Sequence, residues 1–260
     1  MDTAKKELEG RGAIVTGASS GIGEAVATRL AAMGAKVTVT GRRQEGLDVL
    51  VEKIRSAGGE AIAVRGDVRD EEHAAEAVIQ TIEVFGNLTI LVNNAGVIGA
   101  GPVEATDTEE WDRVIDVDLK GPFLFCREAI PHLKARHGAN ILNVSSVTGT
   151  RPYPNLAPYC VAKAGLDMLT QSLAVELAPY GIRVNAINPG VVVTNLHKAT
   201  NTVPDYEAFL ARGKETHPLG FVGHPQDAAE LIAFLVSDRA RWITGGLMPL
   251  DGGRALTSLR

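Results

Sequence analysis

The chain lacks several features that would mark other kinds of protein. It has only two cysteines, Cys126 and Cys160, which lie in separate apolar segments and show no metal or redox spacing. Its six histidines are scattered without the spacing of metal ligands, so no metal site is predicted. No apolar run approaches the roughly 20 residues of a membrane span, and the N-terminal MDTAKKELEG has none of the apolar character of a signal peptide. These absences predict a cytoplasmic protein with no membrane association.

The chain also has no excess of positive charge. Its net charge at pH 7 is −5, with 45% hydrophobic and 22% charged residues. An acidic balance offers no general attraction to phosphate backbones or anionic lipid, so nucleic acid is not an expected partner and a small molecule is. A length of 260 residues without linkers or repeats suits one domain spanning residues 1–260.

Short β-branched runs alternate with longer helical patterns along the whole chain. This alternation predicts an α/β fold, in which parallel strands are joined by helical crossovers. The seven expected strands are 13–16, 36–40, 61–65, 88–92, 140–144, 183–188 and 247–250, and the helices are 23–33, 45–57, 71–85, 108–134, 159–177 and 226–237. The predicted architecture is a single-domain Rossmann fold, with a seven-stranded parallel sheet and helices on both faces.

One long irregular stretch, residues 191–223, contains Pro204, Pro218 and several glycines. We interpret it as a substrate lid, because long loops in compact domains commonly cover a site; a plain surface excursion is the alternative. Two sets of residues are expected to line the substrate pocket: Arg151, Tyr153, Asn155 and Leu156 before the 159–177 helix, and Leu196, His197, Tyr206 and Phe209 in the lid.

The first predicted strand leads into a glycine-rich turn, Thr16-Gly17-Ala18-Ser19-Ser20-Gly21-Ile22-Gly23. Glycines at these positions let the backbone turn sharply and approach a pyrophosphate, while the amides of the following helix face the phosphates. The spacing Gly-x3-Gly-x-Gly is a variant of the dinucleotide-binding fingerprint, and its place between a strand and a helix favours that function over a simple turn.

The second strand ends in Thr40-Gly41-Arg42-Arg43. An NAD site usually has an acidic residue there to accept from the ribose 2′-hydroxyl. Here the acid is missing and two guanidinium groups stand ready for a 2′-phosphate, so the sequence favours NADP(H) over NAD(H). Solvated surface arginines are the alternative.

Tyr159 and Lys163 lie four residues apart in a predicted helix and therefore on one face of it. An ammonium near a phenol favours the phenolate and lowers the tyrosine pKa, which suits proton exchange with an alcohol or carbonyl oxygen. Ser146, at the end of the fifth strand, is placed to hold the same oxygen. A solvated helix face is the simpler alternative.

Together these motifs resemble those of the classical short-chain dehydrogenase/reductase family over nearly the whole chain. The resemblance implies that Tyr159 is the general acid/base, that Ser146 binds the substrate oxygen, and that Lys163 tunes Tyr159 and holds the nicotinamide ribose. It also implies an NADP(H)-dependent oxidoreductase that transfers hydride between nicotinamide and a carbonyl or secondary alcohol. The residues expected to contact the cofactor are Gly17, Ser19, Ser20, Gly21, Ile22, Gly23, Arg42, Arg43, Asp67, Val68, Asn94, Ala95, Gly96, Tyr159, Lys163, Pro189, Gly190, Val192 and Thr194.

One position departs from the family pattern, because Asp118 stands where the family usually has a catalytic asparagine. An ionised Asp118 would keep Lys163 as an ammonium but could draw it away from Tyr159 and the ribose, whereas a protonated one would mimic the amide. The alternative function that follows is a catalytically weakened NADP-binding scaffold or redox sensor.

The resemblance further implies a homo-oligomer, a tetramer or dimer. In the family the helices that correspond to 108–134 and 159–177 form a subunit interface, and both are unusually apolar here. Packing of these helices inside the monomer is the alternative.

Overall fold

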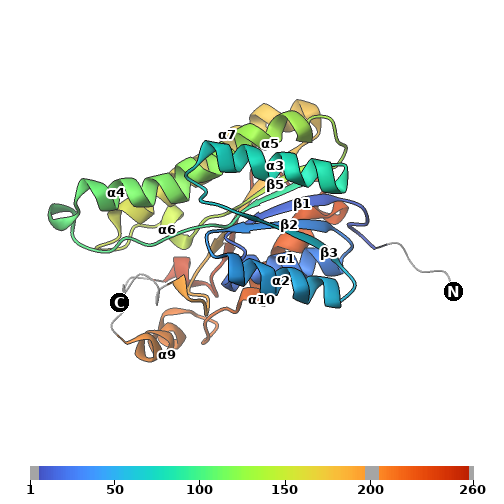
Figure 1. Cartoon of the computed structure of the whole chain (residues 1–260). Coiled ribbons are helices and arrows are strands. Elements are labelled where there is room, and N and C mark those ends of the chain that lie inside the picture. Colours follow the sequence, from blue (N-terminus) through green and yellow to red (C-terminus); the bar gives the residue numbers. More distant parts are fainter. Residues whose placement is uncertain (1–5, 197–204, 258–260) are drawn as a thin grey trace.

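Seven parallel strands form one twisted sheet with helices on both faces (Figure 1). The computed structural model describes residues 6–196 and 205–257. The strands are β1 (Gly12–Thr16), β2 (Lys36–Gly41), β3 (Glu60–Arg65), β4 (Ile90–Asn93), β5 (Asn140–Val144), β6 (Arg183–Pro189) and β7 (Leu247–Leu250). Their order across the sheet is β3-β2-β1-β4-β5-β6-β7, and every neighbouring pair is parallel. The predicted Rossmann fold is confirmed, with strand ends within two residues of those expected.

The two faces of the sheet are covered by different helices (Figure 1). One face carries α1 (Gly21–Ala32), α2 (Gln44–Ser56) and α10 (Pro225–Val236), and the other carries α3 (Glu71–Phe85), α5 (Gly121–Leu133) and α7 (Ala157–Leu177). Each layer has its own apolar core, in which side chains such as Leu30 and Ile232 on one face and Phe125 and Leu177 on the other are fully buried. Because helices cover both sheet faces, the central strands β1, β4 and β5 are buried along their whole length.

The helix predicted for 108–134 is confirmed as one uninterrupted helical segment over 108–133, but it is not a regular α-helix throughout. The segment folds as α4 (Thr108–Ile115), a π-helical turn η2 (Asp116–Lys120) and then α5. Pro122 has no N–H with which to bond the carbonyl four residues back, and the N–H of Gly121 instead donates to the carbonyl of Asp116, five residues back. The wider turn contains Asp118.

The stretch 191–223 is less irregular than expected, because it contains helix α9 (Tyr206–Thr216). The carboxylate of Asp205 accepts the N–H of Ala208 and so caps the helix start, a signal that the sequence reading missed. Tyr206 donates its hydroxyl to the carbonyl of Thr194 at 2.9 Å and joins α9 to the loop after β6.

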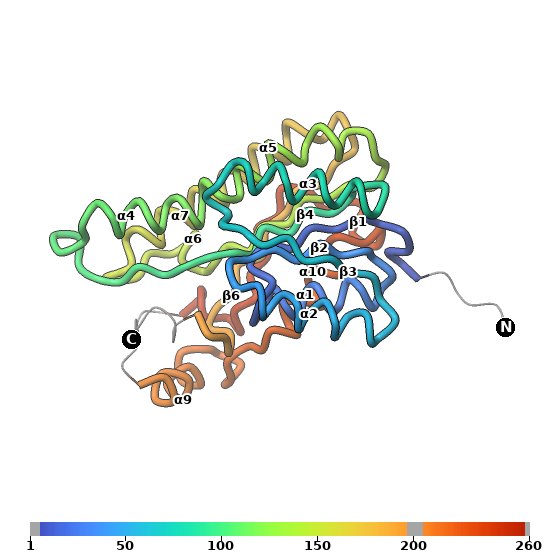
Figure 2. The backbone as a smooth tube through the Cα atoms, viewed as in Figure 1, coloured from blue at the N-terminus to red at the C-terminus, as the bar shows by residue number. Residues whose placement is uncertain are grey.

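The strand order reverses between β1 and β4, and this is where open α/β sheets bind ligands, outside the carboxyl ends of the strands. Those ends point to the left in Figures 1 and 2, toward α4, the short helix α6 (Val147–Thr150) and α9. No helix in the described ranges is long and apolar enough to cross a membrane.

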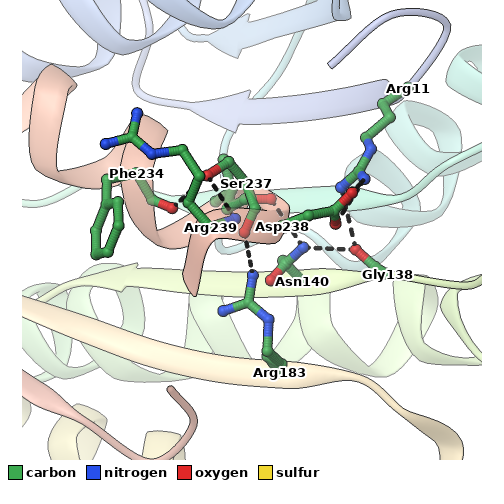
Figure 3. A network of polar contacts seen from close by, with 9 residues as sticks. Arg11, Gly138, Asn140, Arg183, Phe234, Ser237, Asp238 and Arg239 are labelled. Carbon is green, nitrogen blue, oxygen red and sulfur yellow. Dashed lines mark hydrogen bonds and ion pairs between the residues drawn. The ribbon is translucent and has the colours of Figure 1, made fainter. Parts of the chain in front are cut away.

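A polar network fastens the opposite, amino ends of the strands (Figure 3). The amide of Asn140, at the start of β5, donates to the carbonyls of Gly138 and Val236, and Arg183, at the start of β6, donates to the carbonyl of Ser237. Arg11 adds a bidentate ion pair with Asp238 at 2.8 Å. The network ties the end of α10 to the sheet far from the glycine turn.

Asn140→Ala removes a buried amide and leaves the Val236 carbonyl without that donor, so the free energy of unfolding should fall by about 1–3 kcal/mol. Urea unfolding followed by circular dichroism measures the change. Arg239→Ala, which removes an exposed side chain in the same region, is the control and should change stability by less than about 1 kcal/mol. Equal stability of the Asn140 variant and the unmodified protein would contradict a bracing role for this amide.

Candidate active site

The glycine turn is built so that its backbone can approach a ligand. Gly17 and Gly21 have φ of +63° and +61°, a region that favours glycine. A Cβ on Gly23 would lie 2.5 Å from the Gly17 carbonyl oxygen and from the Asn94 amide, so the chain passes too tightly for any side chain. Ser20 precedes α1 but makes no side-chain cap, and the first amides of this 12-residue helix are left for another acceptor. These features fit a pyrophosphate.

Asn94 and Ala95, directly after β4, hold the turn in place. Both of their backbone N–H groups donate to the Thr16 hydroxyl, and the Asn94 side chain donates to the carbonyls of Thr16 and Gly17. Thr194 lies on the other side of the turn, since a Cβ on Gly21 would be 3.2 Å from its methyl group. The structure therefore brings three predicted cofactor segments together, although they lie far apart in sequence.

The predicted arginines lie at the edge of the glycine turn. The Arg43 guanidinium donates to the hydroxyls of Ser19 and Ser20 at 3.2 Å, and Arg42 is exposed beside it. Arg65 joins them because β3 pairs with β2 so that Arg65 lies opposite Gly41, and its side chain donates to the Arg42 carbonyl. Sequence reading missed Arg65, because only the strand register shows that it shares the end of β2.

Asp67 and Val68 follow β3, as predicted. Asp67 already makes a bidentate pair with Arg69, and hydrogen bonding from that guanidinium lowers the carboxyl pKa despite partial burial. Val68 is buried and packs against Gly121 at the start of α5. Asp67 therefore meets a ligand with its carboxylate fixed and ionised.

Tyr159, Lys163 and Ser146 come together at the carboxyl end of β5. All three are buried, with relative exposures of 7%, 3% and 7%, so the alternative of a solvated helix face is wrong. Lys163 Nζ lies 5.7 Å from the centre of the Tyr159 ring, and the Ser146 side chain is among the groups that lower the pKa of the phenol. Ser146 is fixed at the start of α6, where its Oγ accepts the N–H of Thr148.

The pKa of Tyr159 is raised, whereas the sequence predicted that Lys163 would lower it. Burial, the largest influence, raises the pKa of Tyr159, and the charge of Asp118 raises it further. Lys163 and the Ser146 hydrogen bond lower it, but they do not overcome the loss of water. The sequence predicted the effect of the Lys163 charge on the Tyr159 pKa, but it does not show how deeply the phenol is buried.

Asp118 binds Lys163 directly. Its Oδ2 lies 3.1 Å from Lys163 Nζ, and its Oδ1 accepts the N–H of Val97 at 2.8 Å. Lys163 Nζ also donates to the Val144 carbonyl at 3.0 Å. Burial raises the pKa of Asp118. Burial is also the largest single influence on Lys163 and lowers its pKa, but the attractions of Asp118 and Tyr159 together outweigh it, and the pKa of the lysine is raised. A Cβ on Gly96 would lie 3.2 Å from the Asp118 carboxylate, so the pair sits against the predicted cofactor segment after β4.

Two buried residues near the site escaped the sequence reading, namely Asp167 and Asn188. The Asn188 amide donates to the carbonyl of Ser146 and to both oxygens of Asp167. Asn188 precedes the predicted Pro189-Gly190 turn, whose Gly190 N–H donates to the Leu250 carbonyl. Asp167 lies one helical turn after Lys163, which is the signal that could have found it.

The lid segment and the cysteines carry no group of potential metal ligands among the described residues. Val192 makes an isolated bridge with Gly223, which closes the base of the 191–223 segment, and His197 lies outside the described residues. No group of three or more potential metal ligands occurs in the part of the chain that the structure describes. Both cysteines are free, and burial raises the pKa of the Cys126 thiol to about 12.

Comparisons with known proteins give one consistent result. The family model described as enoyl-(acyl carrier protein) reductase matches residues 17–255. The 3beta-hydroxysteroid dehydrogenase 1 of Eggerthella lenta is 42% identical over 96% of this chain and 95% of its own, and the cis-4-hydroxycyclohexanecarboxylate dehydrogenase of Sinomonas cyclohexanicum is 41% identical over 94% and 96%. The crystal structure of a dehydrogenase/reductase from Sinorhizobium meliloti 1021 superposes with a TM-score of 0.89 at 37% identity, covering 96% of this chain and 97% of the other. This chain belongs to the short-chain dehydrogenase/reductase family of oxidoreductases.

Proposed function

We propose that the protein is an NADP(H)-dependent oxidoreductase that interconverts a ring ketone and the corresponding secondary alcohol, with Tyr159 as general acid/base. The observation that carries the proposal is the buried cluster of Tyr159, Ser146 and Lys163 at the carboxyl end of the sheet. Members of the family use a nicotinamide cofactor, NAD(P)(H). Two relatives are named for hydroxyl groups on carbocyclic rings, a 3β-hydroxysteroid and a 4-hydroxycyclohexanecarboxylate, and this supports an alicyclic substrate.

The residues divide the proton chemistry among them. The nicotinamide supplies the hydride in reduction and accepts it in oxidation. Ser146 holds the substrate oxygen, and Tyr159 delivers a proton to it as the ketone is reduced or removes one as the alcohol is oxidised. The raised pKa of Tyr159 keeps the phenol protonated through neutral pH, which suits reduction. Lys163 stabilises the phenolate that remains after the proton has left.

NADP(H) is favoured by the charges at the end of the sheet. Arg42, Arg43 and Arg65 are exposed at the ends of β2 and β3, and Thr40-Gly41 offers no carboxylate to a ribose 2′-hydroxyl. A 2′-phosphate carries the negative charge that three guanidinium groups attract, and arginine binds phosphate through paired N–H groups.

The ion pair of Asp118 with Lys163 supports the second reading, a weakened enzyme that acts as an NADP-binding scaffold or redox sensor. The Lys163 ammonium already contacts the Asp118 carboxylate at 3.1 Å and the Val144 carbonyl at 3.0 Å. Its remaining N–H donor must therefore serve both Tyr159 and a ribose. The intact Ser146, Tyr159 and Lys163 favour the enzyme.

We also propose a homo-oligomer that pairs through α5 and α7. Val161, Met168 and Val175 are spaced seven residues apart on α7 and are 48%, 62% and 79% exposed, and Phe123 on α5 is 47% exposed. A helical stripe of this kind suits a partner helix better than water.

Tyr159→Phe removes the proton donor without changing the shape of the ring. The turnover number should fall about a hundredfold or more, while the dissociation constant for NADPH stays the same. Steady-state kinetics and fluorescence titration measure the two quantities. Tyr180→Phe, at an exposed tyrosine beside Lys134, is the matched control and should behave like the unmodified protein. Full activity of the Tyr159 variant would contradict its role.

Arg42→Ala and Arg43→Ala should each weaken NADPH binding by about ten- to a hundredfold, since a charged hydrogen bond contributes about 1.5–3 kcal/mol. NADH binding should change far less, because NADH carries no 2′-phosphate. Arg136→Ala, remote from the glycine turn, is the control. If both arginine variants keep the native ratio of NADPH to NADH affinity, these side chains do not select the cofactor.

Asp118→Asn removes a charge that raises the pKa of both Tyr159 and Lys163. The pKa of Tyr159 should therefore fall, and alcohol oxidation, which needs the phenolate, should reach its half-maximal rate at a lower pH. The pH profile of kcat/KM for oxidation measures the shift. Asp116→Asn, in the same turn but paired with Lys120 near the surface, should leave the profile unchanged. An unshifted profile in the Asp118 variant would show that this carboxyl carries no charge in the working enzyme.

A further inference from the structure

The segment after β7 forms part of the wall beside the proposed nicotinamide turn. The N–H of Gly190 donates to the carbonyl of Leu250, and a Cβ on Gly190 would lie 3.0 Å from Asp251. The chain then continues into the short helix η5 (Arg254–Leu256). The segment after β7 therefore starts beside Gly190 and reaches Arg151, which follows Ser146 by five residues.

Arg254 joins its own segment after β7 to two others, the loop before α7 and the end of α9. Its Nε donates to the Tyr153 hydroxyl at 3.2 Å, and its Nη1 donates to the Thr216 hydroxyl at 2.8 Å. Tyr153 lies in the loop between Ser146 and Tyr159, and Thr216 is the last residue of α9. The guanidinium is thus held between the loop that joins the two catalytic residues and the lid helix.

A second arginine reinforces the same place. Arg151 Nη1 donates to the carbonyls of Arg254 and Ala255 at 3.1 and 3.2 Å. The two guanidinium carbons lie 6.0 Å and 5.4 Å from the centre of the Tyr153 ring. Two guanidinium groups therefore lie near the Tyr153 ring, in the loop between Ser146 and Tyr159.

Among the described residues, neither Arg151 nor Arg254 forms an ion pair with an acid. Within residues 6–196 and 205–257, no carboxylate oxygen lies within 4.0 Å of Arg151 or Arg254. Asp251 is close in sequence, but its carboxylate accepts the backbone N–H groups of Gly253 and Ala255. Both arginines are partly buried, and every partner given above for their side chains is uncharged. Two half-buried positive charges without a counter-charge favour an anion in the adjoining space.

We infer that Arg254, supported by Arg151, binds a carboxylate carried by the substrate, so that the preferred substrate is a hydroxy or keto acid. The guanidinium of Arg254 uses Nε and one hydrogen of Nη1 for hydroxyl groups, and its Nη2 has no partner among the described residues. A planar carboxylate takes a fork of two parallel N–H groups better than any neutral group does. The inference rests on the proposed function, in which the substrate occupies the space in front of Ser146 and Tyr159.

The arginines at the ends of β2 and β3 do not serve this purpose. Arg42 and Arg43 lie beside the glycine turn, where Arg43 contacts Ser19 and Ser20. Arg151 and Arg254 instead contact the loop after Ser146 and the end of α9. The chain therefore carries two separate cationic sites, one suited to cofactor phosphate and one to a substrate acid.

The test compares 4-oxocyclohexanecarboxylate with its methyl ester, which has the same ring ketone but no charge. The unmodified protein should reduce the acid with a KM about tenfold or more below that of the ester. Arg254→Gln and Arg151→Gln should each raise the KM of the acid toward that of the ester, and by a much larger factor than they raise the KM of the ester. Arg136→Gln, at an arginine that donates to the Gly86 carbonyl, is the matched control. Equal KM values for acid and ester in the unmodified protein, or an unaltered KM for the acid in the Arg254 variant, would overturn the inference.

A binding measurement separates this inference from the proposed reaction. If the unmodified protein reduces neither compound, the proposed ring-ketone activity fails, and calorimetric titration with cyclohexanecarboxylate decides the anion site alone. Binding that weakens about tenfold in Arg254→Gln supports the site, whereas equal or absent binding contradicts it. Arg254→Lys, which keeps the charge and loses the fork, should lie between the two and replaces the glutamine variant if circular dichroism shows that the latter does not fold.

Discussion

The site depends on one buried ion pair, between Lys163 and Asp118. Four segments meet at it: the π-helical turn contributes Asp118, α7 contributes Lys163, and the ends of β4 and β5 contribute the N–H of Val97 and the carbonyl of Val144. A buried ion pair is stable only when further hydrogen bonds offset the loss of water. Both partners here have one, so the pair fixes where α7 stands against the sheet and therefore where Tyr159 lies.

The same burial governs the chemistry of Tyr159. A phenol without access to water resists ionisation, and its raised pKa leaves it as a proton donor at neutral pH. The charge of Lys163 lowers the pKa of Tyr159, whereas the charge of Asp118 raises it. An asparagine at position 118 would carry no charge and so would not raise the pKa of Tyr159. In the proposed reaction, the aspartate would therefore favour the protonated form of Tyr159 over the phenolate.

Much of the fold and the site follows from local sequence. Alternating β-branched and helical runs located the seven strands, and the glycine turn and the spacing of Tyr159 and Lys163 survive as predicted in the structure. Properties that depend on distant contacts did not follow. Arg65 reaches the end of β2 only through strand register, and the rise in the pKa of Tyr159 comes from burial by several elements at once. The π-helical turn at Asp118 was readable from Pro122, whose missing N–H disrupts regular α-helical hydrogen bonding.

The central claim is that this buried cluster reduces a ketone at the expense of NADPH. The most direct measurement follows NADPH absorbance while the unmodified protein is mixed with a series of ring ketones, with NADH run in parallel. Ketone-dependent oxidation of NADPH, faster than that of NADH at the same low concentration, is the result that the account predicts. Tight binding of NADPH without oxidation by any ring or open-chain ketone would contradict it and would leave the scaffold reading in its place.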